Sequence, residues 1–477
     1  MPTKPQSTNK LDTMSSADIV NAVRAEAGNT YQDTIPKAIA PGDALPNGSK
    51  ASMQDSIMRL REIGASLLEY QPAKETFMNV LVNRIGRVMI TSRLYENPWS
   101  RFKQGFLEYG ETIEEIFVGM ANAYQFTPVG TGEEENPFKI FPPNVKAAFH
   151  SMNFRKYYPI TVTNDDLRTA FLSWEGITDL ISKIIEAVYT RANYDEFMVM
   201  KYMIARLALQ GQIYPIVIPE VDADNARTVT ATMVEQGKLL KYMSTKYNRA
   251  GVDNYTDLRW LITILTAKVQ TLFDVEVLAL SFNMSKAELM GRIMEVDGFG
   301  ELDQVRLAEL FADDPYTTYV PLTQDEIQQL NSISGLMVDE RWFMIYDNYM
   351  DMTSIYNGRQ LYWNYFYHVW KTFSTSPFQN AIMFTTTDTT VTALTITPSA
   401  PTVIKGSQTV FTATATGSGF APALVNWSVS GGDSFVSMSS DGILSIKGGT
   451  TSTSVTVTAT SKFDPSVSAT ATVTITG

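Results

Sequence analysis

Residues 361–370 of the chain are LYWNYFYHVW, and this run lies in its most aromatic part. Twelve of the 32 residues from Trp342 to Phe373 are Trp, Tyr or Phe. Aromatic side chains are enriched in strands, and a nearly continuous apolar run is typical of strands that are covered on both faces. We therefore predict long strands here, buried on both faces within the subunit or between subunits.

A long helical pattern lies upstream of this block. Apolar residues recur at spacings of three and four over 177–188, and the pattern continues to Gly211, a typical residue at a helix C-terminus. A helix over 174–210 would be about 55 Å long, so we expect it to form a spine for the domain. Just ahead of it, Thr163 and Asp166 have the spacing of a capping box.

A segment with strand-like ends precedes the helical part. Residues 88–90 and 113–118 are rich in Val, Ile and Met or Phe, and they flank a long excursion with turn-forming and aromatic residues. We predict an extended hairpin over 88–118. Because such a hairpin cannot bury its own tip, it needs a neighbouring subunit. The candidate inter-subunit residues are Arg93, Trp99, Arg101, Lys103, Glu114 and Glu115.

The remaining segments complete the expected organisation. Residues 1–50 are polar and Pro-rich and are expected to form a loosely ordered arm, with a short helix around 16–27. Together with this arm, we predict a main domain over 51–387. Within it, 213–335 mix strands and helices, and 338–387 form strands.

The composition changes abruptly near Asp388. The last 89 residues, 389–477, contain 20 Thr, 15 Ser and six charged residues whose charges cancel, so the formal charge of −12 belongs to the preceding part. Such a change indicates a domain boundary. Alternating apolar residues separated by Gly, Ser and Pro turns predict an all-β sandwich with Phe411, Trp427 and Leu444 in its core.

Several functional classes lack the residues that they need. The chain has no cysteine and only two histidines, His150 and His368, and we predict no catalytic, cofactor or metal site. No apolar run approaches the ~20 residues that span a bilayer, so no membrane partner is predicted. The acidic balance disfavours a dedicated nucleic-acid binder, which would carry clustered Lys and Arg.

The order arm, hairpin, spine helix, α+β region and aromatic strands resembles the tailed-phage major capsid fold of the Hong Kong 97 type. Local runs over roughly residues 80–385 are similar to the major head protein of small short-tailed phages of the Bacillus type. These runs are VNRIG (82–86), TIEEI (112–116), PNVK (143–146), TAFLSW (169–174), VDGF (296–299), WFMIYDN (342–348) and LYWNYFYHVW (361–370).

This resemblance implies an α+β structural protein and no enzyme. It implies that 51–387 form the shell domain, with 213–335 as its axial region and 338–387 as its peripheral strands. It implies self-assembly in rings of five and six into an icosahedral shell around double-stranded DNA, which is held by non-specific contact only. A scaffolding protein and a portal protein are the implied assembly partners. The implied location is the virion, and the host cytoplasm during assembly.

The tail separately resembles the bacterial Ig-like group 2 domain, through residues 394–398, Phe411, 425–427 and 441–445. We expect this module on the outer surface of the shell, for attachment to host cell-wall glycan or for contacts between capsomers. Its removal is expected to leave shell formation largely intact. The alternative function is a bacterial cell-surface adhesin with a carbohydrate-binding Ig-like domain.

Overall fold

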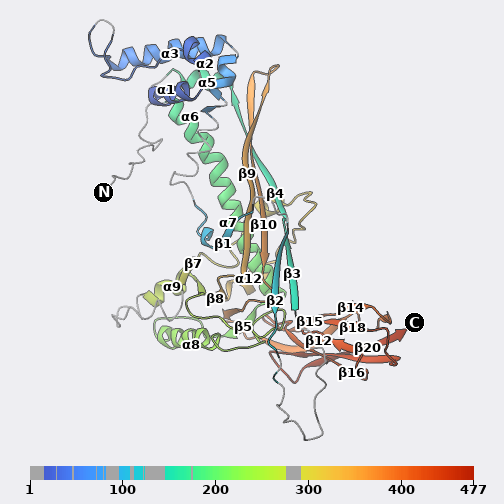
Figure 1. Cartoon of the computed structure of the whole chain (residues 1–477). Coiled ribbons are helices and arrows are strands. Elements are labelled where there is room, and N and C mark those ends of the chain that lie inside the picture. Colours follow the sequence, from blue (N-terminus) through green and yellow to red (C-terminus); the bar gives the residue numbers. More distant parts are fainter. Residues whose placement is uncertain are drawn as a thin grey trace, which may run out of the picture.

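The protein is described by a computed structural model of residues 1–477, which has both helices and strands (Figure 1). The structure describes residues 16–27, 29–45, 48–70, 72–78, 80–81, 96–107, 112–121, 123, 145–172, 176–274 and 292–477.

The spine helix lies where the apolar periodicity places it. It consists of α6 (Gly176–Ile185), a π-helical turn (Glu186–Thr190) and α7 (Arg191–Leu209). Gly211 follows with a positive φ of 65°, and its N–H donates to the carbonyl of Ala208, which confirms the predicted stop. Ahead of the spine, α5 (Asn164–Ala170) begins with the predicted capping box of Thr163 and Asp166.

The aromatic block forms the two longest strands among the described residues, β9 (Phe343–Asn357) and β10 (Tyr362–Thr375). They belong to a four-stranded sheet with the order β1-β9-β10-β4, in which β1 is Lys103–Phe106 and β4 is Phe154–Thr163. This sheet runs beside the spine helix (Figure 1). The prediction of strands is confirmed, but burial on both faces is not seen within the subunit. Along residues 362–370 of β10, buried residues alternate with half-exposed ones.

A second, five-stranded sheet lies near the C-terminal end of the spine (Figure 1). Four helices accompany it: α8 (Ala226–Leu239), α9 (Ala267–Phe273), α11 (Gln304–Leu310) and α12 (Gln324–Asn331). Its strand order is β5 (Tyr214–Val217), β11 (Ala381–Thr385), β8 (Ile333–Asp339), β6 (Leu261–Thr266) and β7 (Arg292–Val296).

This topology changes the predicted boundary at 335–338. Strands β8 and β11 belong to the sheet of the axial region, because β8 pairs with both β6 and β11. Of the strands in the predicted peripheral region 338–387, only β9 and β10 belong to the sheet that runs along the spine helix. The chain therefore leaves the axial sheet after β8 and returns to it at β11.

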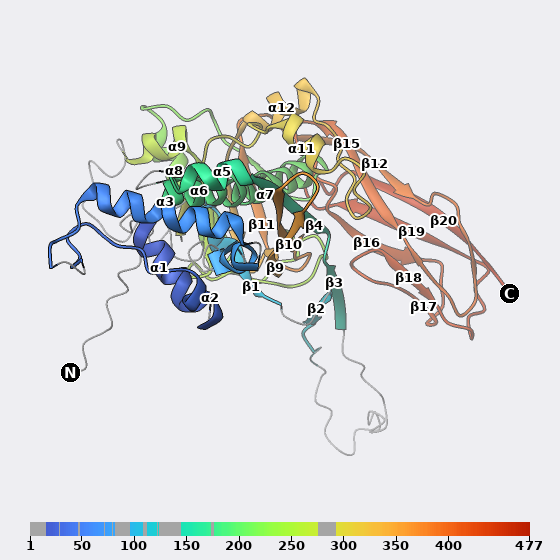
Figure 2. The same cartoon turned by 90° about the horizontal axis from the view of Figure 1, so that it is seen from above.

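The N-terminal part of the described chain is packed against the spine, contrary to the expected loose arm. Helix α1 (Ser16–Glu26) was anticipated as a short helix, and it contacts α6 while burying Ile19, Val20 and Val23. Helices α2 (Asn29–Thr34) and α3 (Met53–Glu69) follow at the same end of the molecule (Figure 2). The polar composition of residues 1–50 did not reveal the apolar face of α1.

Part of the extended hairpin predicted over 88–118 lies outside the described residues. Strand β2 (Thr112–Val118) pairs antiparallel with β3 (Val145–Ser151), whereas the predicted partner 88–90 lies outside the described residues. Residues 103–106, expected within the excursion, form β1 and run parallel to β9. The hairpin is therefore made by β2 and β3.

Residues 389–477 form a β-sandwich at the opposite side of the molecule from α1–α3 (Figure 2). Its sheets are β12-β15, β13-β20-β19-β16 and β14-β18-β17, and one apolar core lies between them. The strands are β12 (Thr390–Thr397), β13 (Thr402–Ile404), β14 (Gln408–Val410), β15 (Thr412–Ser418), β16 (Val425–Ser430), β17 (Val436–Met438), β18 (Ile443–Ile446), β19 (Ser454–Ser461) and β20 (Ser468–Thr476).

Candidate functional site

The two faces of the β2–β3 hairpin differ sharply. On the outer face the side chains of Ile116, Val118, Val145 and Phe149 are 58%, 62%, 51% and 67% exposed. Val118 is opposite Val145 in the register, so these side chains form one continuous apolar strip along both strands. Large apolar side chains gathered on one exposed face are typical of a protein interaction surface.

The inner face of the hairpin is attached to the body of the same subunit. The ring of Phe117 stacks on Phe378 with 5.6 Å between centroids. The hydroxyl of Ser376 donates a 2.7 Å hydrogen bond to Glu115, which also lies 3.3 Å from Nε2 of His150. These contacts fix which face of the hairpin is presented to the outside.

The two acidic residues predicted as contacts with a neighbour therefore have different environments. Glu114 is exposed on the outer face, beside the apolar strip, and stays a candidate contact. Glu115 points to the inner face and is engaged within its own chain. Alternation along a strand places these sequence neighbours on opposite faces of the hairpin, whereas the sequence-based prediction gave both the same role.

The basic and aromatic candidates from the excursion also separate. Arg93 lies outside the described residues. Trp99 is 0% exposed and packs edge-on against Phe197 of α7 with a centroid distance of 5.1 Å, so its predicted contact with a neighbouring subunit is wrong. Arg101 is exposed and forms no ion pair with a described residue. It therefore stays available for a partner.

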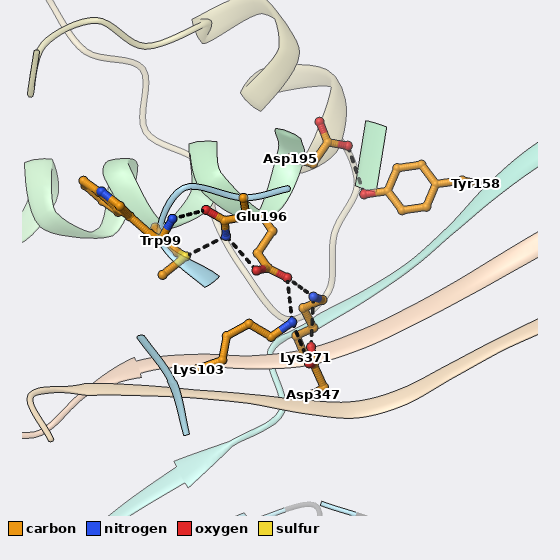
Figure 3. A network of polar contacts seen from close by, with 9 residues as sticks. Trp99, Lys103, Tyr158, Asp195, Glu196, Asp347 and Lys371 are labelled. Atoms are coloured by element: carbon orange, nitrogen blue, oxygen red, sulfur yellow. Dashed lines mark hydrogen bonds and ion pairs between the residues drawn. The ribbon is translucent and has the colours of Figure 1, made fainter. Parts of the chain in front are cut away.

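Lys103 belongs to a buried network of charges that links β1, β9, β10 and α7 (Figure 3). Its Nζ lies 2.6 Å from Asp347 of β9 and 3.4 Å from Glu196 of α7. Lys371 of β10 contacts the same two carboxylates and lies 2.9 Å from Asp347. Because charges removed from water need partners, this network ties β1 and the long sheet to the spine.

The ammonium of Lys371 is strongly affected by its position in the network. Burial, followed by the neighbouring ammonium of Lys103, holds the pKa of Lys371 well below its usual value. The amide of Asn97 donates a 2.6 Å hydrogen bond to the second oxygen of Glu196. Lys103 is thus committed to its own subunit, which contradicts its predicted role at a neighbour.

A second ion pair fixes the other side of the spine helix. Arg306 of α11 lies 2.6 Å from Asp195. The hydroxyl of Tyr158 on β4 donates to the same carboxylate at 2.9 Å (Figure 3). The sequence analysis missed Glu196, Asp195 and Lys371. The available signal was a charged residue inside an otherwise apolar helix or strand, since such residues are rarely buried without a partner.

The predicted core of the sandwich is largely as expected. Phe411 and Leu444 are buried in the apolar core of residues 389–477, and Trp427 packs against that core while remaining partly exposed. Glycine at 442 brings its backbone close to the Trp427 ring.

The described residues contain no group of three or more His, Asp or Glu side chains that could hold a metal ion. Within the same part of the chain, no helix is long and apolar enough to cross a membrane.

Comparison with known proteins agrees with this picture of a structural protein. The model of the Phi29-like phage major capsid protein family matches residues 20–385. The chain belongs to this family. Phi29-like capsid proteins are structural shell components, so the chain is a component of a phage virion capsid, and the expected resemblance is confirmed.

The curated relatives of this capsid protein extend over most of its length. It is 32% identical over 456 residues to the major capsid protein of Bacillus phage B103, covering 93% of this chain and 89% of the relative. It is 31% identical to that of Bacillus phage PZA, covering 91% and 87%. The adhesin alternative finds no support among these relatives.

Among solved structures, the capsid of Staphylococcus phage Andhra matches with a TM-score of 0.45 and 14% identity, covering 62% of this chain and 86% of that one. The α+β capsid fold predicted from the sequence is confirmed for this Phi29-like family member by its family membership and its elements.

Proposed function

We propose that this chain is the repeating subunit of an icosahedral shell that encloses double-stranded phage DNA, and that the outer face of the β2–β3 hairpin is one of its contacts with the next subunit. The observation that carries the second part is the exposed apolar strip of Ile116, Val118, Val145 and Phe149. In a single subunit this strip is exposed to water. A neighbouring subunit would bury it, and burial of apolar surface stabilises a contact by about 25 cal/mol per Å².

Assembly through such contacts does not require any single contact to be strong. Each subunit in a ring of five or six uses different patches for its two neighbours, and several weak contacts made at once stabilise the closed shell. Arg101 and Glu114 are the exposed charged residues that we propose for the rim of such contacts. At the rim they would change the association rate more than the equilibrium affinity.

The remaining partners follow from membership in a family of phage capsid proteins. We propose a scaffolding protein and a portal protein as partners during assembly in the host cytoplasm. DNA would be enclosed without specific contacts, and the net charge of −12 favours weak contact with a polyanion. The sandwich would lie at the outer surface, with host-glycan attachment and capsomer contact as the two roles to distinguish.

The test is assembly of purified protein, with and without scaffolding protein, observed by electron microscopy. Phe149→Asp should abolish shells while leaving the urea unfolding curve of the monomer unchanged, because Phe149 is 67% exposed in the subunit. Ile404→Asp in the sandwich, at a side chain that is 64% exposed, is the matched control and should assemble normally. Normal shells from Phe149→Asp would refute the proposed contact.

A further inference from the structure

A turn of the sandwich reaches the distal end of the β2–β3 hairpin. Lys146, the second residue of β3, donates through Nζ to the carbonyl of Ala250 at 3.2 Å, lies 3.3 Å from Asp441 and contacts the hydroxyl of Ser440. The Ser440 hydroxyl also donates to Ala250 at 3.0 Å. Three segments far apart in sequence therefore meet at Lys146: the hairpin, the loop at Ala250 and the sandwich.

The shell domain holds the hairpin at both ends of its inner face, and at the distal end the sandwich holds it as well. The proximal end, at Glu115 and His150, is bonded to Ser376 and Ser374 of the shell domain. Farther along, Lys146 is paired across the ladder with Phe117, and its ammonium is bonded to the sandwich. In Figure 1 the lower ends of β2 and β3 accordingly lie beside the sandwich.

The sandwich is itself firmly attached to the shell domain, as a support must be. Phe420 is 1% exposed and belongs to the core around the spine helix, and Leu424 belongs to the core of the five-stranded sheet. Gln329 of α12 donates a 2.6 Å hydrogen bond to the carbonyl of Gly419, and Lys462 donates to the carbonyl of Thr245 at 2.5 Å. Because both apolar and polar contacts cross the junction, the sandwich cannot rotate freely.

We propose that the C-terminal sandwich acts as a brace for the β2–β3 hairpin, with Lys146 as the positioning residue that joins them. The shell domain holds the inner face of the hairpin, and the sandwich adds a second attachment at its distal end. The consequence for the shell rests on the function proposed above: the brace orients the apolar strip toward the next subunit.

The brace is tested by hydrogen exchange on the full, unassembled chain. Lys146→Met removes the bonds from Nζ to Ser440, Asp441 and Ala250, and Asp441→Asn removes only the ion pair, from the sandwich side. Both substitutions should raise the hydrogen-exchange rate about tenfold at the distal amides 116–118 and 145–147. Loss of one hydrogen bond to a charged group weakens the local structure enough to increase exchange by about this factor. Amides 112–114 and 149–151, at the proximal end, should change little.

Matched substitutions control for charge and domain. Lys447→Met removes an exposed lysine of the sandwich, and Asp464→Asn removes a carboxylate that accepts hydrogen bonds from Ser466 within the sandwich. Neither should alter exchange in the hairpin. Unchanged distal exchange in both Lys146→Met and Asp441→Asn, or equal increases at both ends of the hairpin, would overturn the brace.

Shell assembly of the same variants separates this inference from the function on which it rests. If the wild-type chain forms shells and Asp441→Asn forms fewer or aberrant ones, brace and assembly contact are linked as proposed. If the exchange gradient appears while Phe149→Asp still forms normal shells, the brace stands and the proposed assembly contact fails.

Discussion

The backbone N–H of Ala423 in the sandwich donates a 2.9 Å hydrogen bond to the carbonyl of Gly211, the residue that ends the spine helix. The same glycine therefore stops the longest helix and receives the C-terminal sandwich. This contact, together with the burial of Phe420, changes our expectation for truncation. Removal of residues 389–477 would uncover parts of two shell cores, so we now expect it to impair folding and assembly.

Gly211 should be among the least replaceable glycines. Gly211→Ala would place a Cβ 2.3 Å from the carbonyl oxygen of Ala421, in a backbone with φ of 65°. We expect urea unfolding to show a loss of about 1 kcal/mol from the conformation and at least ~1 kcal/mol more from displacement of the sandwich. Gly406→Ala, at φ of 84° with open space around it, measures the conformational part alone. Equal losses would show that the junction at Gly211 tolerates the movement.

The buried charge network should respond strongly to loss of one carboxylate. Glu196→Gln leaves Lys103 and Lys371 facing Asp347 alone, and we expect the free energy of unfolding to fall by about 3–5 kcal/mol. Adding Lys371→Met should restore part of this loss, because one ammonium then faces one carboxylate. In the exposed Arg59–Glu62 pair, Glu62→Gln should cost less than about 1 kcal/mol. A failure of the double substitution to recover stability would argue against electrostatic coupling.

Lys462 predicts a dependence of stability on pH. Burial and the nearby ammonium of Lys146 lower its pKa from 10.5 to about 8 in the folded chain. Between these values the unfolded chain binds more protons than the folded one, so stability should increase as pH rises from 8 to 10.5, by up to about 1.4 kcal/mol per pH unit. Urea unfolding across this range should show a smaller increase in Lys462→Met than in Lys447→Met. Parallel curves would contradict the assignment.

Reversal of the charge at Arg101 and at Lys103 should have different effects on assembly and stability, although the two residues are close in sequence. Arg101→Glu changes an exposed side chain, and we expect it to reduce shell assembly in electron micrographs with no change in monomer unfolding. Lys103→Glu places a third carboxylate against Asp347 and Glu196, and should destabilise the monomer by about 3–5 kcal/mol. Normal shells from Arg101→Glu would remove Arg101 from the proposed interface.

Much of the fold could be predicted from local sequence patterns. The apolar periodicity from Ile177 onward, the capping box at Thr163 and the stop at Gly211 are signals within one turn or a few turns of helix, and the structure has all three. The aromatic content of 342–373 likewise indicated strands. These properties depend on neighbours in the chain, so the sequence displays them directly.

Strand partners and side-chain roles were less accessible. Residues 113–118 were recognised as strand, yet their partner is 145–151, across a connection that local pattern does not reveal. Alternation along β2 places Glu114 and Glu115 on opposite faces, although both were predicted to contact a neighbouring subunit. Trp99 was predicted as a contact of the same kind, and only the position of α7 shows that it is buried in its own subunit.

The sequence by itself determined the class of this protein, its spine helix, its aromatic strands and the compositional break near Asp388. The tertiary structure decided what that break means for the subunit. Residues 389–477 have their own core, yet Phe420, Leu424 and Lys462 join them to the shell domain, and Asp441 joins them to the hairpin. Composition records the solvent-facing character of a segment, whereas docking depends on a few side chains brought together from distant positions, and only the folded chain shows which ones meet.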